Sequence, residues 1–306
     1  GTQAVLKKHY GTPGSYKIGS STFPAGSNDW PTKQAITPTG RCQVYANIAL
    51  AMAGYWNGQN KTSIAKESGK DWIYAGFTSV IGELPTVNIT MKNGNVVNQA
   101  DIIYTCPGDV IVYEKYGTTE PGHVDIRTYH GFMSDFVWGP ARKGLPDQSV
   151  YKVIGVYRKY SDTMAIARLQ AFLRIIRERE TTDHPDPYHA LHSNKAGIFL
   201  TFKDESKHPG GTAGAYQIQK GTIDDVLDNW VLYWPKNFTP SAQDRLAIYL
   251  MLARPYSRWQ HPRRNGLGYV LQGNLKAALN EATLNKEWVS LPSGSQCRGF
   301  TLDQMQ

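Results

Sequence analysis

The stretch AIARLQAFLRIIRERETTD, residues 165–183, decides how the second half of this chain folds. Its apolar residues recur every three or four positions, the spacing that lines one face of a helix: Leu169, Phe172, Leu173 and Ile176. At about 100° per residue, Glu180 lies roughly 20° from this stripe, whereas Glu178 lies on the opposite side with Arg174. The pattern predicts a helix over residues 164–180, with Glu180 directed toward the core and Glu178 toward solvent.

The position of Glu180 suggests acid–base chemistry. Burial and the negative end of the helix dipole both disfavour an ionised carboxylate, so we expect a raised pKa for Glu180. A carboxyl group that stays protonated near neutral pH can donate its proton to a glycosidic oxygen. The spacing alone nevertheless favours a structural glutamate at the edge of the core. Glu178 is expected to pair with nearby arginines in solvent.

Length and patterning indicate two folded units. The chain has 306 residues, more than most single domains, and its 41% hydrophobic and 19% charged residues exclude wholesale disorder. Residues 1–40 are rich in turn formers and predict loops. A helix is predicted over 42–54, followed by strands over 85–91, 108–113, 123–128, 132–138 and 150–157. Further helices are predicted over 164–180, 215–228, 240–253 and 274–287. The expected fold class is α+β, with one domain over 1–160 and a mainly α domain over 161–306.

Charge and cysteine content narrow the possible functions. The net charge of +8 is spread over both halves without a basic tail, so we expect an anionic partner such as a cell envelope and no nucleic acid. Three cysteines (Cys42, Cys106 and Cys297) are too few for a disulfide framework. No apolar run approaches the roughly 20 residues of a membrane span, and the first residues do not resemble a signal peptide. A secreted role is therefore expected to need a separate delivery route.

Cys42 stands at the start of the helix predicted over residues 42–54. A thiol at a helix N-terminus meets the positive end of the dipole, which stabilises the thiolate. Downstream, PGDVIVY, GHVDIRT and GFMSDFVW predict three strands of one antiparallel sheet, and His123 begins the second. A cysteine at a helix start facing a histidine on a sheet is the papain-like arrangement, in which a third polar group orients the imidazole ring. Taken alone, a single cysteine is more often a small buried apolar residue.

The second half resembles the lysozyme-like endolysin family of the phage lambda type. Five blocks carry this resemblance in order over about residues 165–296: AFLRIIRERETTD, FKDESKHP, GGTAGAYQIQ, FTPSAQDRLAI and GNLKAALNEATLNKEWVSLPSG. The resemblance implies that Glu180 is the catalytic acid, that Asp204 faces the sugar cleft and that Tyr216 and Gln217 line it. Thr181 replaces the glycine usual in the family, so the backbone beside the acid is expected to differ.

The lysozyme-like resemblance also implies a reaction. Members of that family cleave the bond between N-acetylmuramic acid and N-acetylglucosamine in peptidoglycan, either by hydrolysis or as lytic transglycosylases that form a 1,6-anhydro ring. The sequence offers no second catalytic carboxylate at a secure spacing, so both outcomes stay open. Several aromatic residues could stack on sugars: Trp230, Tyr233, Trp234, Tyr256 and Trp259. Aromatic residues at such positions more often belong to the hydrophobic core.

Residues 38–157 resemble the NlpC-type and CHAP-type cysteine amidases of peptidoglycan. The matching pieces are Cys42 with Tyr45, the Pro-Gly-Asp at 107–109, the Gly-His-Val at 122–124 and the Ser-Asp-Phe at 134–136. The resemblance implies that Cys42 is the nucleophile and His123 its base, and we take Asp135 as the residue that orients the ring.

Two alternatives concern the surroundings of His123. Asp125 is the rival to Asp135, because it follows His123 by two residues and so shares its strand face. A zinc site built from His123, His130 and these aspartates matches no recognised ligand spacing, so we predict no metal and no other cofactor. Cys106 and Cys297 are expected to be structural.

Together the two resemblances predict an enzyme that degrades peptidoglycan with a muramidase domain and a cysteine amidase or peptidase domain. The same organisation occurs in tail lysins and in antibacterial effectors of type VI secretion. That context implies action in the periplasm or cell wall of a target bacterium, a component of the delivery machine as partner, and a cognate immunity protein. One alternative is a muramidase whose first domain only binds peptidoglycan. Another is an interaction protein, such as an inhibitor or a baseplate part, in which both sites are silent.

Overall fold

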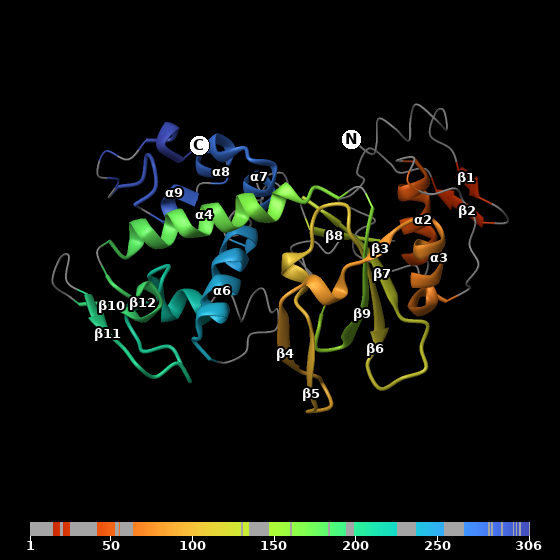
Figure 1. Cartoon of the computed structure of the whole chain (residues 1–306), viewed down its shortest axis with the longest axis horizontal. Helices are drawn as coiled ribbons and strands as arrows, with labels where there is room; N and C mark the ends of the chain where they lie inside the picture. The colour runs from red at the N-terminus through yellow and green to blue at the C-terminus, as the bar shows by residue number, and fades with distance from the viewer. Residues whose placement is uncertain are drawn as a thin grey trace.

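A computed structural model gives the arrangement of the chain, shown in Figure 1. It describes residues 15–18, 21–24, 42–52, 55, 64–129, 131–134, 147–159, 161–182, 184–193, 199–224, 237–253, 266–280, 282, 284–288, 290–295, 297, 299 and 301–305. Helices and antiparallel sheets both contribute, so the fold is α+β, as predicted.

A five-stranded antiparallel sheet forms the centre of the first half. Its strands lie in the order β3 (Thr78–Ser79), β9 (Tyr151–Arg158), β6 (Val110–Lys115), β7 (His123–Thr128) and β8 (Gly131–Met133). The prediction that β6, β7 and β8 would be neighbours in one sheet is confirmed, and β7 has the predicted bounds. The predicted strand over 132–138 is present as β8, and its residues from 135 onward lie outside the described part.

Two helices cover one side of this sheet, α2 (Cys42–Met52) and α3 (Gly69–Tyr74) (Figure 1). The helix predicted from Cys42 is therefore present. Alternate residues of β6 and β7 pack with α2 because side chains two apart point to one face of a strand. This cluster includes Val110, Val112, Val124 and Ile126 from the strands and Cys42, Ala46 and Leu50 from the helix.

Two hairpins accompany the sheet. One pairs β4 (Thr86–Thr90) with β5 (Val96–Ala100), so the strand predicted over 85–91 is present. The other pairs β1 (Ser15–Ile18) with β2 (Ser21–Pro24), inside the region predicted as loops. Short 3-10 turns occur at Ala65–Glu67, Ile81–Glu83, Ile102–Tyr104, Pro187–His189 and Asp303–Met305.

The second half is built around α4 (Met164–Glu180), whose bounds match the prediction. The residues of its apolar stripe are all buried, which confirms the face assignment. The helices α6 (Pro240–Ala253), α7 (Gly266–Gln272), α8 (Leu275–Asn280) and α9 (Leu284–Glu287) pack with it. A small antiparallel sheet has the order β11 (Phe199–Thr201), β10 (Ala190–His192), β12 (Thr212–Ala213) and β13 (Ile218–Gln219).

Two helix predictions in this half need correction. Residues 215–219 are not helical: β12 leads through a turn into β13, and helix begins at Lys220. Gly214 and Gln217 have φ angles of 76° and 47°, which the right-handed helix does not allow. Residues 225–228 lie outside the described part. The single helix predicted over 274–287 is two short helices, α8 and α9, and α7 was not predicted.

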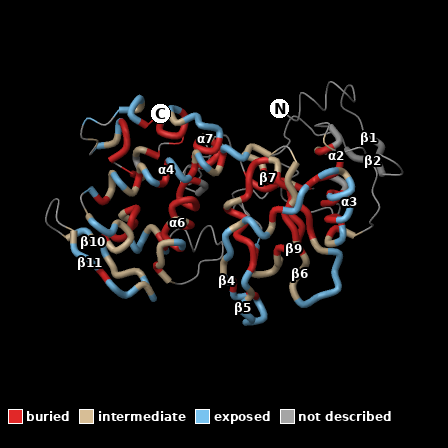
Figure 2. The backbone as a smooth tube through the Cα atoms, in the orientation of Figure 1, coloured by how far each residue is buried: buried red, intermediate tan, exposed pale blue. Residues whose placement is uncertain are grey.

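The two halves share one apolar core. The face of the large sheet turned away from α2 contributes Ile111, Phe132, Val153 and Val156 to the same cluster as Leu169, Phe172, Leu246 and Leu267. Buried residues accordingly continue from the sheet into α6 and α7 (Figure 2). A buried ion pair crosses the same boundary, where Arg245 Nη1 of α6 lies 2.5 Å from Asp101 Oδ2.

Within the described residues, no helix has both the length and the apolar character needed to cross a membrane.

Candidate active sites

Glu180 is the last residue of α4, and its carboxylate is held from another part of the chain. Ser290 Oγ donates to Glu180 Oε1 at 2.5 Å, and the Ser290 backbone N–H lies 3.4 Å from the same oxygen. Burial raises the pKa of Glu180 above its usual range, the two Ser290 bonds lower it, and the negative charge of Glu287 raises it further. The predicted direction of the shift is confirmed.

Ser290 and Glu287 were not singled out from the sequence. Glu287 ends α9, and Ser290 follows it by three residues, so both approach Glu180 from the far end of the chain. About 110 residues separate Ser290 from Glu180 along the chain. A local sequence pattern cannot predict a contact between residues so far apart. The charge of Glu287 acts on the Glu180 carboxyl group, an influence that the spacing of residues along the sequence did not reveal.

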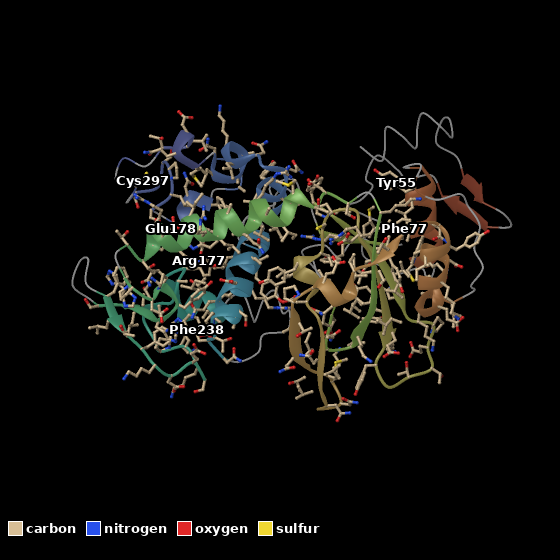
Figure 3. All side chains as sticks on the ribbon, in the orientation of Figure 1. Tyr55, Phe77, Arg177, Glu178, Phe238 and Cys297 are labelled. Atoms are coloured by element: carbon tan, nitrogen blue, oxygen red, sulfur yellow. The ribbon has the colours of Figure 1, made fainter. Side chains whose placement is uncertain are left out.

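Glu178 has the opposite environment. Its side chain is 65% exposed, and Glu178 Oε1 lies 3.7 Å from Arg174 Nε one turn earlier. The predicted solvent-facing arginine pair is confirmed. Figure 3 labels Glu178 beside Arg177 on α4. An exposed pair of this kind contributes only about 0.3–0.5 kcal/mol.

Thr181 directly follows the last residue of α4 and does not adopt the positive φ angle that a glycine would permit. Its φ is −120°, in a region open to any residue, and its Oγ1 donates to the Arg177 carbonyl oxygen at 2.6 Å. The side chain is buried, and its hydroxyl bonds a carbonyl oxygen of the last turn that would otherwise need a water molecule. The residue at 181 therefore fixes the helix end immediately after Glu180.

Tyr216 is a core residue and does not line an open surface. Its hydroxyl donates to Asp244 Oδ1 at 2.5 Å and accepts from Arg177 Nη1 at 2.9 Å. Tyr188 donates to the same Asp244 oxygen at 2.8 Å. Burial, followed by the charge of Asp244, raises the pKa of Tyr216 far above its usual range. This network joins α4, α6 and the β12–β13 turn. Tyr216 therefore links the turn to the last part of α4 through Arg177.

Gln217 and Asp204 have local roles in the structure. Gln217 adopts a positive φ, and its amide donates to the Gly214 carbonyl at 2.8 Å, which closes the β12–β13 turn. Its Oε1 atom is buried and has no hydrogen-bond partner among the described residues. Asp204 is exposed and accepts from the Ser206 backbone N–H at 2.9 Å, and this bonding to Ser206 lowers its pKa. No interaction given by the described residues joins Asp204 to Glu180. The sugar-stacking aromatics proposed from the sequence, at positions 230, 233, 234, 256 and 259, lie outside the described residues.

Cys42 and His123 come together at the start of α2 and the start of β7. Both are buried, with 8% and 6% of their surfaces exposed, and their side chains are joined by a hydrogen bond. Burial alone would lower the pKa of His123, but the charge and hydrogen bond of Asp125, followed by Cys42, raise it to about 10. The imidazole is therefore positively charged at neutral pH, beside the sulfur of Cys42.

Asp125 lies against His123. Its Oδ1 atom is 3.1 Å from His123 Nε2, and the aspartate is fully buried. Ser134 Oγ lies 3.3 Å from the same nitrogen, so strand β7 and the end of β8 hold one edge of the ring. Asp135, our sequence-based choice, lies outside the described residues. Among the residues that are described, Asp125 occupies the orienting position.

Two tyrosines enclose the imidazole. The Tyr113 ring lies 5.9 Å from the His123 ring at an interplanar angle of 30°, and the Tyr151 ring lies 5.7 Å from it. Tyr113 is buried, whereas Tyr151 is only partly covered. Both rings therefore pack near the imidazole of His123.

The other two cysteines, Cys106 and Cys297, differ in their exposure to solvent. Cys106 is buried, and burial raises its pKa to about 11, so it is an unreactive thiol at neutral pH. Cys297 is partly exposed and, like the other two, is not in a disulfide. Within the described residues, no group of three histidine, cysteine or acidic side chains is placed to hold a metal ion. His130 lies outside that part of the chain.

Comparison of the chain with protein-family models, with curated proteins and with solved structures found no match.

Proposed function

We propose that this protein degrades peptidoglycan with two active sites, one for the glycan strand and one for the stem peptide. The glycan site rests on Glu180, and the observation that carries it is a partly buried carboxyl group with a raised pKa, one oxygen of which accepts hydrogen bonds from Ser290. A carboxylic acid of this kind protonates the leaving oxygen of a glycosidic bond. The order of sequence blocks around it, which resembles lysozyme-like endolysins, identifies the muramic acid–glucosamine bond as the substrate. The lysozyme-like fold of this half belongs to the same proposal.

The outcome of glycan cleavage depends on what completes the reaction. A transglycosylase needs only Glu180, because the muramic 6-hydroxyl serves as nucleophile and returns its proton to the same residue. A hydrolase needs a second group to hold water. The charge of Glu287 acts on Glu180 and raises its pKa, so Glu287 is the candidate carboxylate for that purpose. This influence supports hydrolysis over the anhydro product.

The peptide site rests on the convergence of Cys42, His123 and Asp125. The thiol bonds a charged imidazole, and a buried aspartate holds the ring. This is the arrangement of a cysteine nucleophile with its base and orienting group. It favours a papain-like amidase or peptidase over a silent binding module, because a binding surface does not require a thiol and an imidazolium to be paired in a buried site.

Separate substrates test the two sites independently. Glycan strands stripped of stem peptides should be shortened by the parent protein and by Cys42→Ala, and should be unchanged by Glu180→Gln. Soluble monomeric muropeptides should lose peptide to the parent and to Glu180→Gln, and should be untouched by Cys42→Ala. Chitin, which lacks the lactyl group and the peptide, serves as the control polymer. A parent protein that leaves both peptidoglycan substrates intact would show that the proposal is wrong.

The biological setting belongs to the same proposal. A peptidoglycan-degrading chain with two sites fits an antibacterial effector or a lysin that acts in the periplasm or cell wall of a target bacterium. A producer of such an effector needs a cognate immunity protein, and the effector needs a delivery machine. Expression of the protein in a bacterium with a signal that directs it to the periplasm would test its toxicity, and co-expression of an immunity protein should suppress it. Toxicity should require an intact Glu180 or Cys42.

A further inference from the structure

Tyr151 shares one end of the large sheet with the proposed cysteine site. It begins β9 and pairs with Lys115 of β6, while Tyr113, two residues earlier on β6, pairs with His123 of β7. Residues two apart on a strand share a face, so this register brings Tyr151, Tyr113 and His123 together. The ring distances agree: 5.7 Å from Tyr151 to His123 and 6.3 Å from Tyr151 to Tyr113.

Tyr151 differs from Tyr113 in its access to solvent. Tyr113 is completely buried, whereas Tyr151 is half-buried. The charges of Lys115, Glu120, Cys42 and Asp125 all act on its phenol. Tyr151 is therefore a partly exposed side chain whose ring lies 5.7 Å from the ring of His123.

The phenol of Tyr151 keeps its proton under physiological conditions. Burial raises its pKa, the charges of Glu120, Cys42 and Asp125 add to the rise, and Lys115 opposes it. A protonated phenol beside a nucleophile is a hydrogen-bond donor. The developing negative charge of an acyl-transfer reaction needs such a donor close to the attacked carbonyl.

We propose that Tyr151 donates a hydrogen bond to the carbonyl oxygen of the stem peptide while Cys42 attacks it, a role that rests on the proposed amidase. The thiolate sulfur forms a bond to the carbonyl carbon, and the C=O π electrons move to the oxygen, which accepts the Tyr151 O–H. The electrons then return, the C–N bond breaks, and the amine leaves with the proton of His123. Water then attacks the carbonyl carbon of the thioester and gives one proton to the neutral His123, the C–S bond breaks, and the Cys42 thiolate and the carboxylic acid product are released. Tyr151 retains its proton throughout.

Tyr151→Phe separates this role from activation of the thiol. Removing one donor to a developing oxyanion lowers kcat by about 10²–10³-fold. Monomeric muropeptides should therefore be cleaved with that loss of kcat and little change in KM. Alkylation of Cys42 by iodoacetamide forms no oxyanion, so its rate and pH midpoint should match those of the parent protein. This second measurement also shows that the variant is folded. Tyr157→Phe is the matched control, a half-buried tyrosine on the same strand, and it should cleave muropeptides at the parent rate.

Three results would overturn the assignment. An active parent with an unchanged kcat in Tyr151→Phe would show that the phenol does not contact the reacting oxygen. A Tyr151→Phe variant whose Cys42 alkylation falls as far as its kcat would show that Tyr151 acts only through His123. A parent that alkylates rapidly at Cys42 yet cleaves no muropeptide would overturn the proposed amidase and, with it, this role for Tyr151.

Discussion

Glu178 and Glu180 lie two residues apart on α4, and their surroundings assign them different roles. Glu180 is bonded by Ser290 and has a raised pKa, whereas Glu178 is exposed beside Arg174. Glu180→Gln keeps the shape of the side chain but cannot donate a proton, so glycan cleavage should fall by about 10²-fold or more. Glu178→Gln should retain nearly full activity. Shortening of glycan strands stripped of stem peptides measures both variants, and equal losses in the two would contradict the assignment.

Ser290 tunes the same carboxyl group. Its two hydrogen bonds stabilise the charged form and lower the pKa of Glu180, so Ser290→Ala should raise that pKa further. A general acid is active while protonated, and the alkaline limb of its pH profile follows its pKa. The alkaline limb of kcat/KM for glycan cleavage should therefore move to higher pH in Ser290→Ala. Glu287→Gln removes a charge that raises the pKa, so its alkaline limb should move to lower pH. A shift of both variants in one direction would contradict the electrostatic account.

Asp125 supports the charge on His123. Its carboxylate and hydrogen bond are the largest influences that raise the His123 pKa to about 10 against the cost of burial. Asp125→Asn should lower that pKa, weaken the imidazolium and move the midpoint of Cys42 alkylation by iodoacetamide to higher pH. Cys106, with a pKa raised to about 11, provides an internal control that should stay slow at neutral pH. An unchanged midpoint for Cys42 would assign the orienting role to another residue, with Asp135 the first to test.

At the scale of elements, the turn between β12 and β13 is closely constrained by its neighbours. Gly214 has a φ of 76°, and a Cβ there would lie 2.2 Å from Gln243 Oε1. Gln243 Oε1 accepts a hydrogen bond from the Ala215 backbone N–H, and its Nε2 donates to the carbonyl oxygens of Tyr188 and Phe238. The side chain therefore cannot move without breaking these three hydrogen bonds. Gly214→Ala should lower the free energy of unfolding by about 2 kcal/mol or more.

Gly210→Ala provides the matched control for that turn. Gly210 also has a positive φ, 93°, but nothing lies within 4 Å of a Cβ at that position. Its cost should be only the backbone strain, about 1 kcal/mol. Denaturant unfolding of both variants measures the difference, and equal losses would show that contact with Gln243 contributes nothing.

The sequence predicted those elements whose periodicity is regular. The apolar spacing of residues 165–176 is unbroken, and α4 and β7 match their predicted bounds. The turn at 214–217 was taken as helix, because its positive φ angles depend on packing against Gln243, which lies about 28 residues farther along the chain. The contacts of Glu180 with Ser290 and of His123 with Ser134 likewise depend on tertiary structure. Local pattern placed Glu180 toward the core, Cys42 at the start of a helix and His123 at the start of a strand, but it did not reveal the groups that surround them.

At the scale of the whole molecule, a buried ion pair joins the two halves. Arg245 is 3% exposed and contacts Asp101, and it also donates to Gln148 Oε1 at 2.9 Å. Asp101→Asn would leave a buried cation without its counter-charge, which costs about 3–5 kcal/mol. Thermal unfolding should therefore begin at a clearly lower temperature in this variant.

The exposed pair of Lys92 and Asp147 provides the comparison for that ion pair. Their side chains are 69% and 47% exposed, so Asp147→Asn should change stability by less than about 1 kcal/mol. Similar melting temperatures for Asp101→Asn and the parent would show that the halves do not depend on this contact. Two separate transitions in Asp101→Asn, against one in the parent, would show that the pair couples their unfolding.

The most direct test of the proposed function is mass spectrometry of the fragments released from purified sacculi by the parent, Glu180→Gln and Cys42→Ala proteins. The parent should release short glycan fragments and free stem peptides together. Glu180→Gln should release only peptides, and Cys42→Ala only glycan fragments that still carry their peptides. Reducing ends on the glycan would identify hydrolysis, and 1,6-anhydro ends transglycosylation. Sacculi that the parent protein leaves intact would contradict the account.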